Sequence, residues 1–187
     1  MKRTLLGLIG ALVVYVGWLR LVVSEETALR HVSRIMRFIA MLFRYKVQNV
    51  EALPEEGAAL VICYHGFIPL DMYFFVEHVH RMTGRKPVTC VADFVFSVPL
   101  LSWVVKLGGG IPANRRETLK ALQEGGIVIV APGGVREAMT TTAEDYAVRW
   151  FGRSGFADIA RQTKATIVPM FTRNIRDVFL VLGGGNT

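Results

Sequence analysis

Short β-branched runs alternate with helix-like segments from residue 58 onward, and this alternation is the strongest constraint on how the chain folds. Strands are expected over residues 58–63, 87–92, 127–131 and 165–171. Helices are expected over residues 71–82, 97–107, 115–124 and 156–163. The pattern predicts an α/β fold with a mixed, largely parallel sheet flanked by helices, in which ligands bind at the carboxyl ends of the strands.

The N-terminal region differs from this body and points to a membrane. Residues 5–23 are almost uninterrupted apolar sequence, which just reaches the roughly 20 residues that a helix needs to cross a bilayer. Lys2 and Arg3 precede the segment, so a cleaved signal peptide is the alternative, but residues 22–25 make a poor cleavage site. The segment therefore predicts a retained membrane-anchoring helix.

A second N-terminal segment, residues 27–45, has the pattern of a basic amphipathic helix. Apolar residues recur at helical spacing, while Arg30, Arg34 and Arg37 share another face. Such a helix lies in a lipid interface, and the alternative is an ordinary helix packed on the core with solvated arginines. The expected organisation is a membrane anchor and amphipathic helix over 1–46 and an α/β domain over 47–187, whose abrupt glycine-rich end suggests truncation.

Composition narrows the class of partner. The 187 residues carry a formal net charge of +7, so an acidic partner is expected. The basic residues form no nucleic-acid-binding signature, which favours an anionic membrane surface. The expected location is a membrane, namely the endoplasmic reticulum in a eukaryote or the inner membrane in a bacterium. Cys63 and Cys90 lie in strand-like runs without metal-ligand spacing, so neither a metal site nor a catalytic thiol is expected.

The candidate catalytic residues lie directly after the first expected strand. The run YHGFIPLD, residues 64–71, puts the imidazole of His65 and the carboxylate of Asp71 at one edge of the sheet. An imidazole has an unperturbed pKa of about 6.5, so this pair has the chemistry of a general base. The alternative is a hydrogen-bonded structural histidine, and this run alone does not separate the two.

Three blocks marked by glycine or proline follow in order: GGGIPANRR at 108–116, APGGVRE at 131–137 and IVPMF at 167–171. Together with the histidine block before them, they resemble the four ordered blocks of the glycerolipid acyltransferase superfamily. Its members are membrane enzymes that acylate glycerol phosphate and lysophosphatidic acid. The resemblance covers roughly residues 45–175.

Two departures from the usual family pattern narrow this resemblance. Five residues separate His65 from Asp71 where the family usually has four, and Gly133 stands where the third block usually has Glu. Both features are similar to the branch of diacylglycerol acyltransferases and plant-type phytyl ester synthases. The resemblance therefore implies a neutral hydroxyl acceptor, such as a mono- or diacylglycerol, in place of lysophosphatidic acid.

The resemblance implies a membrane-bound O-acyltransferase that moves an acyl group from acyl-CoA to a lipid hydroxyl. His65 would take the hydroxyl proton and Asp71 would orient the imidazole. The implied partners are acyl-CoA as co-substrate, a lipid acceptor and membrane lipids, with no cofactor and no nucleic acid. The alternatives are a lysophospholipid or glycerol-phosphate acyltransferase and a non-catalytic lipid-binding relative. A serine hydrolase is disfavoured because the chain has no Gly-x-Ser-x-Gly elbow.

Further residues of these blocks are expected to bind substrate. The backbone N–H groups of Gly133 and Gly134 suit a thioester oxyanion, with a plain tight turn as the alternative. Arg115, and less securely Arg116, suits a phosphate of coenzyme A or of the acceptor, with a solvated helix start as the alternative. The full substrate-binding set implied by the resemblance is Gly110, Arg115, Pro132, Gly133, Gly134, Arg136 and Glu137.

Overall fold

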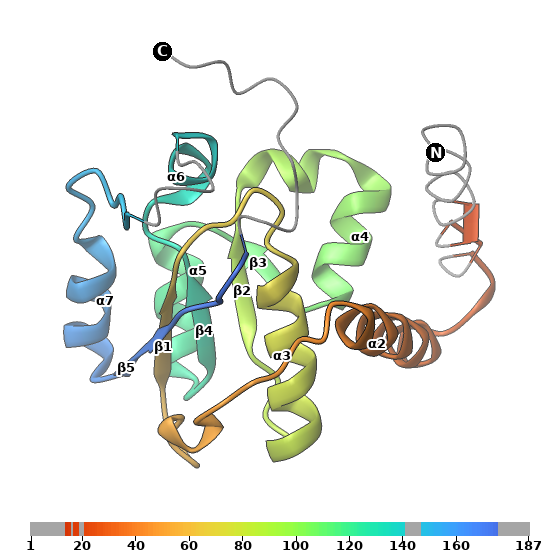
Figure 1. The fold of residues 1–187 in the computed structure, drawn as a ribbon, viewed down its shortest axis with the longest axis horizontal. Coiled ribbons are helices and arrows are strands. Elements are labelled where there is room, and N and C mark those ends of the chain that lie inside the picture. The colour runs from red at the N-terminus through yellow and green to blue at the C-terminus, as the bar shows by residue number, and fades with distance from the viewer. Residues whose placement is uncertain (1–13, 16, 19–20, 141–146, 176–187) are drawn as a thin grey trace.

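One parallel sheet forms the centre of the molecule (Figure 1), seen here in a computed structural model that describes residues 14–15, 17–18, 21–140 and 147–175. The strands lie in the order β3-β2-β4-β1-β5, and each pair of neighbours is parallel. Their bounds are Ala59–Cys63 for β1, Val88–Val91 for β2, Gly110–Pro112 for β3, Ile127–Val130 for β4 and Thr166–Met170 for β5. The expected α/β fold is confirmed, and its described strand pairs are all parallel.

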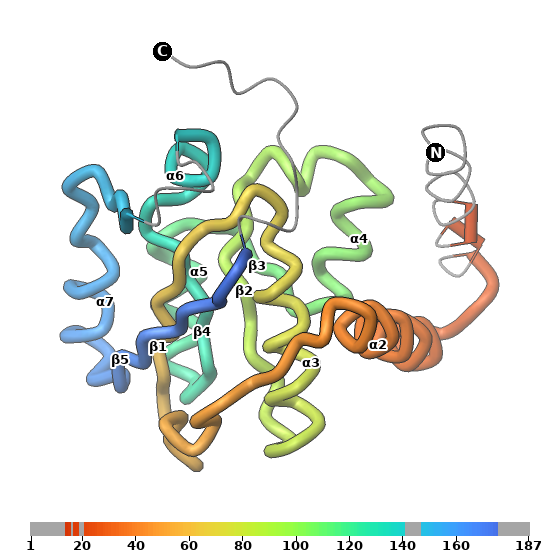
Figure 2. Tube along the Cα trace, viewed as in Figure 1, coloured from red at the N-terminus to blue at the C-terminus, as the bar shows by residue number. Residues whose placement is uncertain are grey.

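Helices flank this sheet, as Figure 2 shows along the Cα trace. The described α-helices are α2 Glu25–Leu42, α3 Leu70–Thr83, α4 Pro99–Leu107, α5 Arg115–Gln123, α6 Gly134–Thr140 and α7 Gly155–Thr163. Two 3-10 helices, η1 Val50–Ala52 and η2 Asp93–Ser97, lie in the connections. The start of α5 is set by Asn114, whose side chain accepts a hydrogen bond from the Glu117 N–H at 3.0 Å.

Alternate residues of β1 enter two separate hydrophobic cores, one on each face of the sheet. Val61 and Cys63 pack with α3 in one core, while Leu60 and Ile62 pack with α5 and α7 in the other. Because both faces are covered, the strand reads in the sequence as an unbroken apolar run. The resulting three layers leave the carboxyl ends of the strands free for a site.

The expected helix over 97–107 is present as α4, but it begins two residues later, after a separate 3-10 helix. The 3-10 helix η2 ends at Ser97 and α4 begins at Pro99, with Val98 extended between them at φ −98° and ψ 111°. A residue before proline is driven out of the helical region, which explains the break. Two short elements, β3 and α6, were not expected from the sequence, because glycines at their first residues resemble loop signals.

The amphipathic helix expected over 27–45 is present as α2, which packs beside α3 and α4. It lies on the side of the molecule opposite α7 (Figure 1). Of the expected anchor over 5–23, the structure describes only residues 14–15, 17–18 and 21–23, so most of that prediction lies outside the described residues. Among the residues that are described, no helix is both long and apolar enough to cross a bilayer.

Candidate active site

The topology brings two of the sequence blocks together at one edge of the sheet. β1 and β4 are direct neighbours, and their register pairs Ile62 with Val130. The chain leaves β1 toward His65 and leaves β4 toward Pro132, so both blocks emerge side by side at the carboxyl ends of the strands. This is the position at which parallel α/β sheets bind ligands.

The imidazole of His65 is held by its own loop. Its Nδ1 lies 2.6 Å from the carbonyl oxygen of Gly66. A carbonyl oxygen only accepts hydrogen bonds, so Nδ1 is the donor in this contact, and in the neutral ring Nε2 keeps its lone pair. The side chain is half-buried and not enclosed in the core. The residue therefore has the tautomer that a general base requires.

Asp71 lies in the first turn of α3 and is only 3% exposed. No hydrogen bond joins its carboxylate to the His65 ring, and its Oδ1 has no hydrogen-bond partner among the described residues. Burial raises the pKa of Asp71, while the Thr172 side chain, nearby backbone N–H groups and the His65 ring oppose that rise. The expected imidazole–carboxylate contact is thus replaced by the Gly66 carbonyl in this structure.

The block after β4 forms a tight turn into α6. Gly134 adopts a left-handed φ of 58° and donates its N–H to the Ala131 carbonyl at 3.0 Å. That N–H is therefore already engaged and does not serve as the expected oxyanion donor. The N–H of Gly133 has no hydrogen-bond partner in the described part of the chain and remains the candidate donor.

Glu137, in the first turn of α6, is fully buried at 0% exposure. Its Oε2 accepts the backbone N–H of His65 at 3.0 Å, and its Oε1 accepts the backbone N–H of Arg149 at 2.6 Å. This carboxylate connects the histidine block directly to the block after β4. It is enclosed, which differs from the expected contact with substrate.

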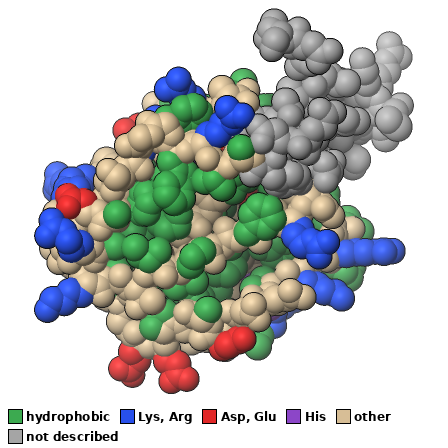
Figure 3. All heavy atoms as spheres, turned by 60° about the vertical axis from the view of Figure 1, so that its left-hand side comes forward, with side chains coloured by type: hydrophobic (Ala, Val, Ile, Leu, Met, Phe, Trp, Pro, Cys, Tyr) green, Lys and Arg blue, Asp and Glu red, His purple; other side chains and the backbone are tan. Residues whose placement is uncertain are grey.

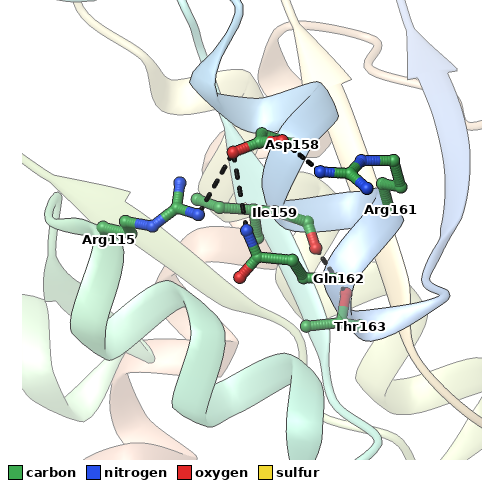
Figure 4. Close-up of polar contacts among 6 residues, drawn as sticks. All are labelled: Arg115, Asp158, Ile159, Arg161, Gln162 and Thr163. Carbon is green, nitrogen blue, oxygen red and sulfur yellow. Dashed lines mark hydrogen bonds and ion pairs between the residues drawn. The ribbon is translucent and has the colours of Figure 1, made fainter.

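Arg115 lies at the start of α5, beside a small pocket of about 340 Å³ that Pro132 and Arg153 also line. Its Nη2 is 3.3 Å from Asp158 Oδ2, which also accepts from Gln162, while Asp158 Oδ1 accepts from Arg161 (Figure 4). The hydrogen bond from Arg161, together with the contact to Arg115, lowers the pKa of Asp158. Arg115, which was expected to bind a phosphate, therefore lies near the site, but its guanidinium already pairs with Asp158.

The remaining expected residues, Arg136, Gly110 and Arg116, lie in three different surroundings. The guanidinium of Arg136 stacks 4.1 Å above the Phe151 ring. Gly110 lies in β3, two strands away from β4, with Val105 of α4 so close that a side chain would not fit. Gly110 thus serves close packing and does not join the site. Arg116 is 91% exposed at the side chain.

A larger groove of about 800 Å³ lies on the other side of the β1 end. It runs between α3, residues 43–53 and β5, and its lining includes Leu70, Asp71, Phe74 and Ile175. Hydrophobic side chains gather on the face that carries β5 and α7 (Figure 3). Ile175 also contacts the histidine loop, because a Cβ at Gly66 would lie 2.6 Å from Ile175 Cγ1. The groove therefore borders the loop that holds His65.

Comparison with known proteins agrees with this architecture. The family model described as Acyltransferase matches residues 44–173. The chain belongs to the Acyltransferase family. The resemblance drawn from the four sequence blocks is thereby confirmed. Within the described residues of this Acyltransferase domain, no group of three or more His, Cys, Asp or Glu side chains is placed to hold a metal ion.

Several curated relatives share most of the Acyltransferase domain. A Bos taurus protein named "DGAT1/2-independent enzyme synthesizing storage lipids" is 44% identical over 140 residues, which is 75% of this chain and 42% of that protein. Its Homo sapiens namesake is 42% identical over 75% of this chain and 43% of its own length. An uncharacterised Mycobacterium leprae protein is 32% identical over 78% of this chain and 40% of its own length. The matches thus span less than half of each relative, and no solved structure matches the chain.

Sequence reasoning missed one side chain of this Acyltransferase site. Arg153 donates from Nη1 to the carbonyl oxygens of Pro132 and Gly133, at 3.2 and 3.1 Å, and lines the small pocket with Arg115. Arg153 lies in a short Gly-Arg-Ser-Gly run without a motif of its own. Only the tertiary contact reveals it, because no spacing in the sequence links residue 153 to the block after β4.

Proposed function

We propose that this Acyltransferase-family chain transfers an acyl group from acyl-CoA to the hydroxyl of a neutral lipid such as a mono- or diacylglycerol. The single observation that carries the proposal is the 2.6 Å contact of His65 Nδ1 with Gly66 O, which leaves Nε2 of the neutral ring to accept a proton. The relatives named for storage-lipid synthesis support a neutral-lipid product.

In the proposed reaction, Nε2 of His65 takes the acceptor's hydroxyl proton as its oxygen bonds to the thioester carbonyl carbon. The C–S bond then breaks, and the leaving thiolate of coenzyme A takes the proton back from the imidazolium. The Asp71 carboxylate is near enough for a charged His65 ring to favour its ionised form, and we assign it the stabilisation of the imidazolium. The N–H of Gly133, which has no hydrogen-bond partner in the described part of the chain, is the proposed oxyanion donor.

The two hollows near the carboxyl ends of the strands suit the two ends of the substrates. The larger groove combines apolar side chains such as Phe74 and Ile175 with cations such as Arg44, and its apolar part fits a lipid acyl chain. The smaller pocket has Arg115 and Arg153 at its rim, which fits a phosphate of coenzyme A. We assign the groove to the acyl chain and the pocket to the phosphate end.

The proposed location is a membrane surface, in the endoplasmic reticulum of a eukaryote or the inner membrane of a bacterium. The support is α2, whose Phe38 is 57% and Leu42 64% exposed, while Arg34 and Arg37 are exposed on the same helix. Apolar side chains together with arginines are typical of helices that lie in a lipid interface. Such a location concentrates the lipid substrates at the site.

The test is turnover by the full-length chain in detergent micelles, with labelled acyl-CoA and a panel of glycerides and alcohols. We expect His65→Ala to lower kcat by about 10²- to 10⁴-fold, the usual contribution of a general base. The matched control is His80→Ala, which removes an exposed imidazole from α3. Equal turnover by His65→Ala and wild type overturns the proposal, and binding of acyl-CoA without turnover by wild type establishes the non-catalytic lipid-binding alternative.

A further inference from the structure

Glu137 is a buried carboxylate that the proposed reaction leaves without a chemical task. It is 0% exposed, and each of its oxygens accepts a backbone N–H, one from His65 at 3.0 Å and one from Arg149 at 2.6 Å. An enclosed carboxylate cannot contact a substrate in the groove or the pocket. These two hydrogen bonds join three separate segments of the chain.

The turn before α6 is shaped to let this carboxylate pass. A Cβ built at Gly133 would lie 2.6 Å from Glu137 Oε2 and would also overlap the side-chain carbons. Only glycine therefore fits at position 133 while Glu137 keeps its present position. The same glycine carries the N–H that is the candidate oxyanion donor.

The hydrogen bond to His65 is the type that fixes a backbone firmly. The His65 N–H lies beyond the end of β1, which ends at Cys63, so the sheet does not satisfy it. A carboxylate acceptor makes a charge-assisted hydrogen bond, about twice as strong as a neutral one. Loss of this acceptor would leave a half-buried N–H without its partner and the loop free to move.

We propose, building on the acyl-transfer function above, that Glu137 is a positioning residue for His65. Its carboxylate holds the His65 backbone at a fixed distance from the Gly133 turn, so that the base and the oxyanion donor face the same thioester. A displacement of about 1 Å between such groups can cost 10²-fold in rate.

The kinetic signature separates positioning from substrate contact. We expect Glu137→Gln, which keeps the size but offers a single acceptor oxygen, to lower kcat about 10- to 100-fold with KM nearly unchanged. A substrate ligand would instead raise KM with kcat preserved, and that result overturns the proposal. The control is Glu124→Gln, which removes an equal charge from an exposed position at the end of α5.

A spectroscopic test reads the hydrogen bond without any need for activity. The chain has four histidines, so ¹⁵N-histidine labelling of the full chain in micelles gives a simple amide spectrum in which His65→Asn identifies the His65 signal. We expect Glu137→Gln to move the His65 amide signal and leave the other three in place, and Glu124→Gln to move none. An unmoved His65 signal overturns the proposal.

The wild-type protein supplies a measurement that does not depend on whether the variant folds. The His65 amide hydrogen is expected to exchange slowly with solvent, because Glu137 protects it beyond the end of the strand. Exchange at the rate of an unprotected amide overturns the proposal. If wild type shows slow exchange but no acyl transfer, the positioning contact stands and the proposed function fails, so the two failures are distinguishable.

Discussion

At the scale of single residues, the central feature is a carboxylic acid that lies in apolar surroundings close to a base. Asp71 is 3% exposed and its Oδ1 has no hydrogen-bond partner among the described residues. Burial disfavours the charged carboxylate and raises the pKa of Asp71. The buried carboxyl group therefore lowers the stability of the fold. A residue with a purely structural role is not expected to have this effect, so the burial of Asp71 agrees with a role beside His65.

This pKa shift predicts how stability depends on pH. Because the folded-state pKa of Asp71 is raised, its contribution to stability is fully present below the unfolded pKa of about 3.9 and is lost as pH rises through the folded value. Asp71→Asn has no carboxyl group to ionise, so this variant does not lose that stability as pH rises. We expect the melting temperature of Asp71→Asn, relative to wild type, to increase as pH rises from 4 toward neutrality, as measured by circular dichroism.

The control for this titration is Asp93→Asn, at an exposed position in η2. It should leave the pH dependence of the melting temperature as it is in wild type. A difference between Asp71→Asn and wild type that stays constant with pH, or that shrinks as pH rises, would contradict the account of a destabilised buried carboxylate.

At the scale of elements, one side chain fastens several connections at the end of the sheet opposite the site. Arg85, after α3, donates to the carbonyl oxygens of Pro54 at 2.5 Å, Gly57 at 2.5 Å and Gly125 at 2.9 Å. These carbonyls lie just before β1 and β4, two neighbouring strands in the interior of the sheet. Arg85 thus joins the loops from which both site-bearing strands begin.

We expect Arg85→Ala to lower the free energy of unfolding by about 2 kcal/mol, since hydrogen bonds to a charged group contribute about 1.5–3 kcal/mol. For a chain of this size that corresponds to a melting temperature lower by roughly 4–8 °C. Arg85→Lys should retain only part of the stability that Arg85 contributes, because a single ammonium group cannot reach several carbonyls as the branched guanidinium does. Arg116→Ala, at an exposed position, is the comparison, and an equal effect of both alanine variants would refute the prediction.

Most elements could be predicted from the sequence because their signals are local. The strand at Ile127–Val130 and the helix at Leu70–Thr83 follow directly from a β-branched run and from helical spacing. The elements β3 and α6 could not, because they begin with Gly110 and Gly134, whose local preference is for a turn. In both cases tertiary contacts with neighbouring segments override that preference.

The site was predictable to a similar extent and for the same reason. His65 and the block after β4 were placed correctly at one sheet edge, because the carboxyl ends of parallel strands must share that edge. The hydrogen bonds of His65 to Gly66 and Glu137 were not predictable, since they depend on loop geometry. Gly110 was misplaced because strand order cannot be read from the order of blocks in the chain.

At the scale of the whole molecule, two opposite sides differ in the side chains that they expose. α2 lies on one side with exposed apolar residues and arginines, while α7 lies on the opposite side (Figure 1). The arginines around α2 and the net charge of +7 favour an anionic surface. The molecule is therefore expected to dock on lipid with its α2 side, while the exposed charged side chains of Asp158 and Arg161 keep the outer surface of α7 in water.

A dye that reports its environment tests this orientation. We expect a label on Leu42→Cys, in α2, to insert into the bilayer of vesicles made of phosphatidylcholine and phosphatidylserine, where it is shielded from iodide quenching. High salt should reduce this shielding, because it screens the attraction between the arginines and the anionic lipid. A label on Gln162→Cys, in α7, should remain accessible to iodide. Burial raises the pKa of the thiols of Cys63 and Cys90, so neither competes for the label. Equal quenching at positions 42 and 162 would exclude the proposed orientation.

The short link between the imidazole of His65 and the carbonyl of Gly66 has a consequence for transplanting the site. Because neighbouring main chain, and not a distant acid, decides which ring nitrogen donates, the proton-accepting unit is portable as a dipeptide in its native loop conformation, provided that an acceptor such as Glu137 fixes its backbone. A designer who grafts it onto another parallel sheet needs to copy that conformation first. The spacing to a carboxylate then becomes adjustable, which accounts for how a spacer of five residues can replace one of four.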